Sequence, residues 1–406
     1  MTHSFSGQRI GRRAAAVLVS EFTRHPGPKS AIVVGADESS PVLSGAINAL
    51  LPGDSLTVVA DELFAGSGSA AALAGRVAAE GSWVSQRVTV ISSLADAKPA
   101  DAVLVGQLLD RHTAPAAAAE LRGSVNAGGV LCLATVATPG QDVKDLPDST
   151  GSDLVLWNRP FARIHRLRFS AADLELAERL EPATRPSSVP LAGQWRIDSN
   201  GVAAAAVCLG AAVLAKKMRP QSKVWMAAAL AAAPAAAFFR DPERVPPEDP
   251  QSVVSGCDGQ VLGVERLTDD RFASAEHSDW LRIAVFLSVL DVHVNRSPVA
   301  GRVLEVIRET GSNAPAMKPA AEHNVAAYTV LGTARGPVVV AQRTGILARR
   351  IVNRTRPGTL LARGERFGLI RFGSRTDVYL PAESADSLVA PGERVIGGES
   401  VIARWR

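Results

Sequence analysis

Continuous apolar runs alternate with alanine-rich stretches along the first part of the chain. Runs that end in glycine or an acidic residue predict strands buried on both faces of a sheet, and the alanine-rich stretches predict helices. Strands and helices that alternate at this spacing predict an α/β domain with a doubly wound parallel sheet over residues 1–181. The predicted strands cover residues 30–35, 56–61, 88–91, 101–106 and 127–134.

The pattern changes near residue 240, where short apolar segments follow one another between glycine and proline turns. Segments of this kind predict antiparallel strands with little helix. We therefore expect residues 240–406 to form an all-β barrel or sandwich domain. Its strands are predicted at residues 260–265, 281–287, 302–307, 327–331 and 337–341, with further strands on both sides of Ser374.

Two apolar segments, residues 201–215 and 224–239, lie between these domains, and a basic segment separates them. A proline-containing linker over residues 182–200 precedes them. Each apolar segment is shorter than the roughly 20 residues that span a bilayer as an untilted helix. Three interpretations stay open for the hairpin at 201–239: a pair inserted in the membrane, a pair lying in one leaflet, and two buried core helices.

Charge is distributed unevenly along the chain. Residues 1–200 carry 18 Lys/Arg and 20 Asp/Glu, whereas residues 201–406 carry 26 Lys/Arg and 20 Asp/Glu. A basic C-terminal half favours an anionic partner surface. The basic residues are not interleaved with aromatics and no nucleic-acid reader motif occurs, so we expect anionic lipid and no nucleic acid.

The cysteines are few, and the N-terminus lacks a long apolar run. Cys132, Cys208 and Cys257 are far apart and lack metal-ligand spacing, which predicts a reducing compartment with neither a disulfide framework nor a metal site. The apolar run that begins at Ala14 is interrupted by Glu21, too soon for an export signal. We therefore expect no signal peptide.

A glycine–serine pair stands where two predicted strands meet, at Gly373-Ser374. A glycine carbonyl is unshielded and tolerates strained dihedral angles, so the Ser374 hydroxyl can reach it. Attack would give an ester, and β-elimination of that ester would split the chain and leave a dehydroalanine that hydrolyses to a pyruvoyl group. The alternative is an ordinary Gly-Ser turn, the commoner use of such a pair.

Six segments, the last of which contains this pair, follow one another in a characteristic order. They are Phe-Phe-Arg-Asp-Pro-Glu-Arg (238–244), Val-Ser-Gly-Cys-Asp-Gly-Gln-Val (254–261), Asp-Val-His-Val-Asn-Arg-Ser-Pro (291–298), Ala-Arg-Arg-Ile-Val (348–352), Arg-Gly-Glu-Arg-Phe-Gly (363–368) and Phe-Gly-Ser-Arg (372–375). Their order and wording resemble the phosphatidylserine decarboxylase proenzymes, particularly the short branch with a Phe-Gly-Ser-Arg cleavage site. The resemblance covers about the last 200 residues, roughly half of the chain.

The resemblance implies an enzyme, a carboxy-lyase that converts phosphatidylserine to phosphatidylethanolamine and CO2. Ser374 would become the pyruvoyl group, and cleavage of the Gly373–Ser374 bond would give chains 1–373 and 374–406 that stay associated. The pyruvoyl carbonyl would form a Schiff base with the substrate amine and act as the electron sink. The resemblance also implies the cytoplasmic side of the cell membrane, and it leaves a homodimer open.

An Asp–His pairing activates the serine in the proenzymes that the chain resembles. Asp258 matches the aspartate of their Ala-Asp-Gly motif, and His293 is the one histidine in the 291–298 segment. In the longer branch this segment reads His-x-x-His, whereas Arg296 stands at the second position here, and arginine does not act as a base near neutral pH. We expect Asp258 and His293 to serve with Ser374, and the step that His293 serves stays open.

Cationic side chains near these motifs are candidate contacts for the phosphodiester or carboxylate of the substrate. Guanidinium groups bind such anions through paired hydrogen bonds. The alternative for each is a place on the solvated surface. The candidates are Arg296, His323, Arg349, Arg350 and Arg375.

The N-terminal domain resembles a second family. A glycine-ended strand, an acidic-ended strand, an Asp-led strand and a Gly-Gly strand, in this order, resemble the S-adenosylmethionine-dependent methyltransferases. Cofactor binding there needs a turn with several glycines, whereas the turn at 35–40 has one, although Asp61 or Glu62 could accept from a ribose. We expect a Rossmann-like domain without bound S-adenosylmethionine. The alternative functions are a working methyltransferase and a non-cleaving, membrane-bound lipid-binding protein.

Overall fold

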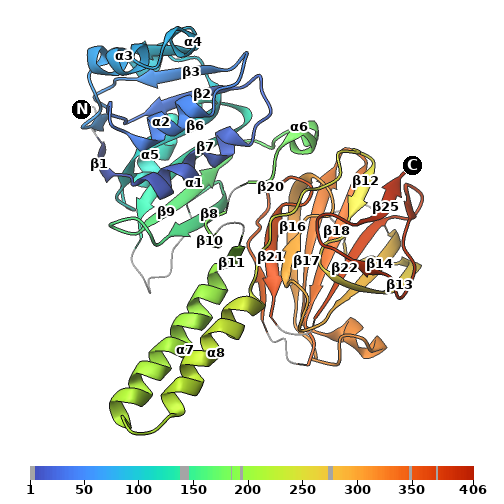
Figure 1. The fold of residues 1–406 in the computed structure, drawn as a ribbon. Coiled ribbons are helices and arrows are strands. Elements are labelled where there is room, and N and C mark those ends of the chain that lie inside the picture. Colours follow the sequence, from blue (N-terminus) through green and yellow to red (C-terminus); the bar gives the residue numbers. More distant parts are fainter. Residues whose placement is uncertain are drawn as a thin grey trace. The chain divides into compact units, whose positions relative to one another are not determined.

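The computed structural model describes residues 5–137, 146–183, 185–192, 195–272, 278–346, 350–371 and 374–406. The chain divides into two compact units, Met1–Thr184 and Arg185–Arg406 (Figure 1). Each unit has its own hydrophobic core.

The first unit is a doubly wound α/β domain, as predicted. Its main sheet has the order β5-β3-β2-β6-β7-β9-β8; the pairings from β5 to β7 are parallel and those of β9 are antiparallel. Val33 of β2 lies in one core cluster and its neighbour Val34 in another, because helices cover both faces of the sheet. The strands are β2 (Ser30–Val34), β3 (Ser55–Val59), β5 (Val88–Ile91), β6 (Ala100–Leu109), β7 (Val125–Val136), β8 (Ser149–Val155) and β9 (Ala162–Leu167).

Two short strands and several helices complete this unit. Strand β1 pairs with the carboxyl half of β6 and with β4. The elements are β1 (Phe5–Arg9), β4 (Phe64–Ala65), α1 (Arg12–Thr23), α2 (Pro41–Asn48), α3 (Ala70–Ala78), α4 (Ser82–Ser85), α5 (Ala114–Leu121), α6 (Leu174–Arg179) and the 3-10 helices η1 (Leu94–Asp96) and η2 (Arg122–Ser124).

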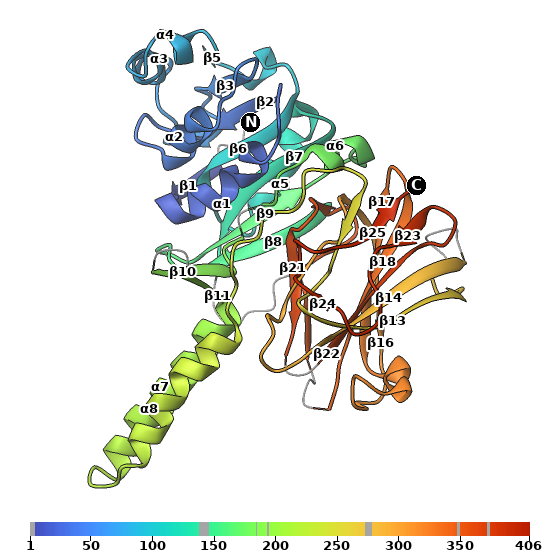
Figure 2. The ribbon, with the colours of Figure 1, turned by 45° about the vertical axis from the view of Figure 1, so that its right-hand side comes forward.

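The second unit begins with a strand pair and a helical hairpin. Strands β10 (Ser188–Ala192) and β11 (Trp195–Asp198) pair within the segment expected as a linker. Helices α7 (Ser199–Met218) and α8 (Val224–Phe238) then pack side by side (Figures 1 and 2). By length and composition, helix α7 is long and apolar enough to cross a membrane.

Helix α7 is longer than the sequence pattern predicts, and both of its ends explain why. Asp198 caps the first turn, because its carboxylate accepts the N–H of Asn200 at 2.9 Å. At the other end the helix continues through Lys216 and Lys217, whose charges interact favourably with a helix C-terminus. The basic residues therefore extend the helix and do not interrupt it.

The rest of the second unit is all-β, as predicted, in three antiparallel sheets. A curled eight-stranded sheet has the order β20-β16-β17-β18-β22-β14-β13-β24, and the smaller sheets are β12-β25-β23 and β15-β21-β19. Side chains from the large sheet and from β12 and β25 share one core cluster. The strands are β12 (Ser252–Val254), β13 (Gly259–Thr268), β14 (Asp279–Leu287), β15 (Val294–Arg296), β16 (Gly301–Glu309), β17 (Ala326–Thr333), β18 (Gly336–Arg343), β19 (Ile351–Asn353), β20 (Leu360–Leu361), β21 (Arg366–Ile370), β22 (Ser374–Pro381), β23 (Ala385–Ser387), β24 (Arg394–Val395) and β25 (Val401–Trp405).

Gly259 allows β13 to start close to β14. Its φ is +152°, and an added Cβ would lie 2.1 Å from the main-chain oxygen of Phe286. We expect Gly259→Ala to lower the free energy of unfolding by roughly 1–3 kcal/mol in chemical denaturation. Gly263→Ala in the same strand is the matched control, because an added Cβ there meets nothing within 4 Å. Equal denaturation midpoints for the two variants would contradict this account.

Candidate active site

Ser374 is the first residue of β22 and is completely buried. Main-chain pairing with Leu287, the last residue of β14, fixes its position. Among the described residues, its Oγ has no hydrogen-bond partner. A buried hydroxyl without a hydrogen-bond partner lowers the stability of the fold by about 1–3 kcal/mol. The Ser374 hydroxyl is therefore a candidate for a catalytic role. The other half of the predicted cleavage pair, Gly373, lies outside the described residues.

His293 directly precedes β15 and is buried. Its Nδ1 lies 2.9 Å from the main-chain oxygen of Asp291. A carbonyl oxygen only accepts, so Nδ1 carries the proton and donates, and Nε2 keeps its lone pair. Within the described part of the chain, this buried Nε2 has no hydrogen-bond partner. The histidine is therefore held in the tautomer that can accept a proton.

The surroundings of His293 keep it neutral. Burial lowers its pKa to about 4, although its bond to the Asp291 main chain opposes the shift. The ring of Phe238, the last residue of α8, packs on the imidazole with 4.2 Å between ring centroids. Phe238 in turn clusters with Phe239 and Leu369. At neutral pH the imidazole is a free base.

The fold brings His293 and Ser374 to the same region of the unit. The main-chain oxygen of His293 accepts the N–H of Ile370 at 3.3 Å, and Ser374 follows Ile370 after three residues. Both residues present a buried polar atom without a partner among the described residues. A neutral base and a hydroxyl are the two groups that nucleophilic attack requires.

Asp258 contacts Arg244 and Gly397 and does not form the predicted pair with His293 among the described residues. Its carboxylate accepts from the Arg244 guanidinium at 3.0 Å and from the Gly397 N–H at 2.8 Å. Burial raises its pKa. In the described part of the chain it forms no hydrogen bond with His293, which bonds to the main chain of Asp291 instead.

Arg296 is engaged inside the domain. It forms an ion pair with Asp241 at 3.4 Å and donates to the main-chain oxygens of Gly364 at 3.0 Å and Pro242 at 2.7 Å. Burial lowers its pKa to about 10, and the guanidinium stays charged at neutral pH. These contacts hold the segment that follows the helical hairpin against the β domain.

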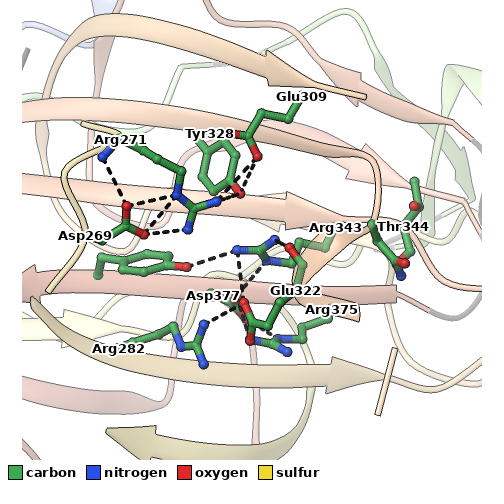
Figure 3. Close-up of polar contacts among 12 residues, drawn as sticks. Asp269, Arg271, Arg282, Glu309, Glu322, Tyr328, Arg343, Thr344, Arg375 and Asp377 are labelled. Atoms are coloured by element: carbon green, nitrogen blue, oxygen red, sulfur yellow. Dashed lines mark hydrogen bonds and ion pairs between the residues drawn. The ribbon is translucent and has the colours of Figure 1, made fainter. Parts of the chain in front are cut away.

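Arg375 belongs to a buried ionic cluster that the sequence analysis did not predict (Figure 3). Its guanidinium donates to both oxygens of Asp377, at 2.6 and 2.9 Å, and to Glu322 at 2.7 Å. The fully buried Arg343 donates to Asp377 at 2.9 Å. Burial alone would raise the pKa of Glu322, but Arg375, Arg343 and Arg282 together lower it to about 2. The cluster fixes the strand directly after Ser374.

The remaining candidate contacts lie on the surface or outside the described residues. His323 is exposed at the end of the 3-10 helix η4 (Pro319–His323), and Arg350 is exposed before β19. Arg349 lies outside the described residues.

The carboxyl edge of the α/β sheet does not offer an open glycine turn. The ring of Phe64 lies 3.1–3.3 Å from where a Cβ on Gly35 would be. The Asp61 carboxylate accepts the N–H groups of Leu63 at 2.9 Å and Leu94 at 3.0 Å. Phe64 therefore occupies the space beside Gly35, and the Asp61 carboxylate already has two main-chain partners.

Comparison with known families matches residues 232–403 to the family described as phosphatidylserine decarboxylase. A phosphatidylserine decarboxylase proenzyme of Carboxydothermus hydrogenoformans is 42% identical over 168 residues, which are 41% of this chain and 78% of that protein. The proenzyme of Nocardia farcinica is 42% identical over 205 residues, 50% of this chain and 85% of that protein. The proenzyme of Symbiobacterium thermophilum is 48% identical over 169 residues, 41% and 77% of the two chains.

Methyltransferases are among the structural neighbours of the N-terminal half. The O-methyltransferase TomG of Streptomyces achromogenes is 15% identical with a TM-score of 0.28, over 39% of this chain and 78% of that one. An O-methyltransferase of Bacillus cereus is 11% identical with a TM-score of 0.28, over 39% and 80% of the two chains.

The burial of His293 predicts its titration. Its pKa of about 4 is below the ordinary 6.5, so between these values the unfolded chain binds the proton more readily. The contribution of His293 to the free energy of unfolding is complete above pH 6.5 and is lost as the pH falls through 4. NMR titration should give a pKa near 4 in the folded protein. Phe238→Ala, which exposes the ring, should raise it, and a wild-type pKa near 6.5 would refute the buried neutral state.

The ionic cluster predicts a large cost for one substitution. Asp377→Asn removes the nearer of the two carboxylates that face the fully buried Arg343, and breaking a buried pair at one partner costs about 3–5 kcal/mol. We expect the midpoint of urea denaturation to fall strongly. Asp386→Asn, in the exposed pair with Arg406, is the control and should leave the midpoint nearly unchanged. Similar midpoints for both variants would argue against a structural role of the cluster.

Proposed function

The chain belongs to the phosphatidylserine decarboxylase family, and we propose that it converts phosphatidylserine to phosphatidylethanolamine and CO2 after cutting itself between Gly373 and Ser374. One observation carries the self-cleavage: the Ser374 hydroxyl and the His293 Nε2 are both buried and without partners among the described residues. Each would cost free energy in a purely structural role, and together they supply a nucleophile and its base.

The proposed cleavage proceeds through an ester. Ser374 Oγ bonds to the Gly373 carbonyl carbon, the amide C–N bond breaks, and the hydroxyl proton passes through His293 to the released amine. Transfer of the Ser374 α-proton to a base then expels Gly373 as a carboxylate and leaves a dehydroalanine. Its imine tautomer takes up water and releases ammonia, so chain 374–406 begins with a pyruvoyl group. That carbonyl supplies the electron sink for loss of CO2.

His293 is assigned to the cleavage step because of its protonation state. With a pKa of about 4 it is free to accept the Ser374 proton at neutral pH. The Asp291 main-chain oxygen keeps the reactive nitrogen unprotonated by fixing the tautomer. Asp258 is retained as a positioning residue, because its carboxylate links Arg244 to the main chain of Gly397.

The two fragments are proposed to stay associated after cleavage. Strand β22 would be the first element of the small chain. It pairs with β14 on one side and β18 on the other. The Arg343–Asp377 pair and the Asp258–Gly397 hydrogen bond also join residues from opposite sides of the cut. Hydrogen bonds and buried charges would therefore hold the small chain without the peptide bond.

Substrate binding is assigned to cations that are not engaged inside the domain. Arg296 and Arg375 form ion pairs with carboxylates inside the domain, so we assign them a structural role. Arg350 is exposed, and we assign it to the phosphodiester or carboxylate of the lipid, with His323 as a second contact. Other serine phospholipids carry the same groups and would meet the same residues.

The helical hairpin is proposed to hold the enzyme on the cytoplasmic face of the cell membrane. Helix α7 has 20 residues, about 30 Å of helix. Val207 of α7 and Leu230 of α8 are each 72% exposed. The basic residues between α7 and α8 favour anionic head groups. They are Lys216, Lys217, Arg219 and Lys223.

Ser374→Ala tests the cleavage directly. Intact mass of the detergent-solubilised wild type should show two fragments split at Gly373/Ser374, the smaller with a blocked, ketone-reactive N-terminus. The variant should remain one chain without decarboxylase activity, because the nucleophile is absent. Ser387→Ala, elsewhere in the small chain on β23, should cleave like the wild type. An uncleaved but active wild type, or fragments of the same mass from Ser374→Ala, would overturn the assignment.

A further inference from the structure

Two loops leave the eight-stranded sheet at the strand ends beside which Ser374 lies. Leu287 at the end of β14 pairs with Ser374, and Arg343 at the end of β18 pairs with Arg375. All three strands are antiparallel neighbours, so the loops after β14 and β18 emerge beside the start of β22. The described residues that directly follow these strands, 288–291 and 344–346, border the candidate active site.

Both loops expose aliphatic side chains, Val289, Leu290 and Ile346, which we call the apolar rim. Val289 is 47% exposed and Ile346 is 56% exposed. Leu290 is 84% exposed, the highest fraction for any large apolar side chain among the described residues. Exposed aliphatic side chains at the border of a site suit a surface that contacts an apolar partner.

The turn that carries Val289 and Leu290 is internally fixed. The N–H of Ser288 donates to the Asp291 carboxylate at 2.8 Å, and the N–H of Asp291 donates to the Ser288 oxygen at 3.0 Å. The two apolar residues therefore project from a closed four-residue turn. A turn held in this way loses little conformational entropy when its tip becomes buried.

The same turn is attached to the helical hairpin and to the catalytic histidine. The guanidinium of Arg240, two residues after the end of α8, donates to the main-chain oxygen of Leu290. On the other side, the Asp291 oxygen accepts from His293. The apolar rim thus lies where the hairpin joins the β domain.

We infer that the apolar rim inserts into the bilayer surface next to the hairpin, so that the border of the site is in contact with the lipid layer that holds the substrate. This inference rests on the proposed function. Attachment to an apolar hairpin through Arg240 favours a bilayer over a protein partner. The exposed Arg350, which follows the loop after β18, suits an anionic head-group layer.

The test compares substrate in vesicles with substrate in solution. The double variant Val289→Ser/Leu290→Ser removes the tip of the rim, and Leu388→Ser, at a 55% exposed leucine after β23, is the matched control. The full-length proteins are assayed on phosphatidylcholine vesicles containing phosphatidylserine and on short-chain, monomeric phosphatidylserine. Vesicle flotation measures binding, and intact mass measures self-cleavage.

The double variant should cleave itself and decarboxylate the short-chain substrate like the wild type. Its vesicle binding and its rate on vesicles should fall about tenfold or more, because two aliphatic side chains no longer leave water. Leu388→Ser should match the wild type in every assay.

Three outcomes would overturn the inference. Unchanged vesicle binding and rate would mean that the rim does not contact the bilayer. Equal loss on both substrates would mean that the turn acts only through His293. A changed oligomeric state in sedimentation, with unchanged vesicle binding, would mean that the rim meets a second copy of the chain. A wild type that never cleaves would instead refute the proposed function.

Discussion

The register of β22 between β14 and β18 is the constraint on which the site depends. All eight residues of this strand are buried, and it pairs on both sides. A slip by one residue would turn every side chain to the opposite face. It would also take Asp377 away from the fully buried Arg343 and Arg375 away from Glu322, which would break two ion pairs of the ionic cluster. The ionic cluster therefore fixes the strand, and the strand fixes Ser374.

The second requirement is a histidine that is buried yet reactive. Burying an imidazole favours its neutral form, and one main-chain hydrogen bond is enough to choose the tautomer. The packing of Phe238 supplies that burial from the end of α8. An element outside the β domain thus sets the chemistry of a residue inside it.

Sequence patterns predicted both fold classes and pointed to Ser374 and His293, each of which has a buried side-chain atom without a partner among the described residues. The apolar runs of the first unit reflect strands that are buried on both faces of a sheet. The short strands of the second unit reflect burial on one face. Phe238 and the Arg343–Asp377 pair were missed, because each depends on contacts between segments far apart in the chain. Arg375 was predicted as an anion ligand, whereas it binds Asp377, two residues further along, and Glu322 from a distant 3-10 helix.

The central place of β22 would also determine how long a protein cut before Ser374 lasts. Before cleavage, the peptide bond keeps the strand at a high effective concentration beside its partners, so a transient opening closes again within one molecule. After the proposed cleavage, loss of β22 from the sheet would separate two chains, and recovery would become a bimolecular reaction between a large fragment and a short one. Folding must then precede cutting. The lifetime of the cut protein would depend on its rate of unfolding more than on an equilibrium.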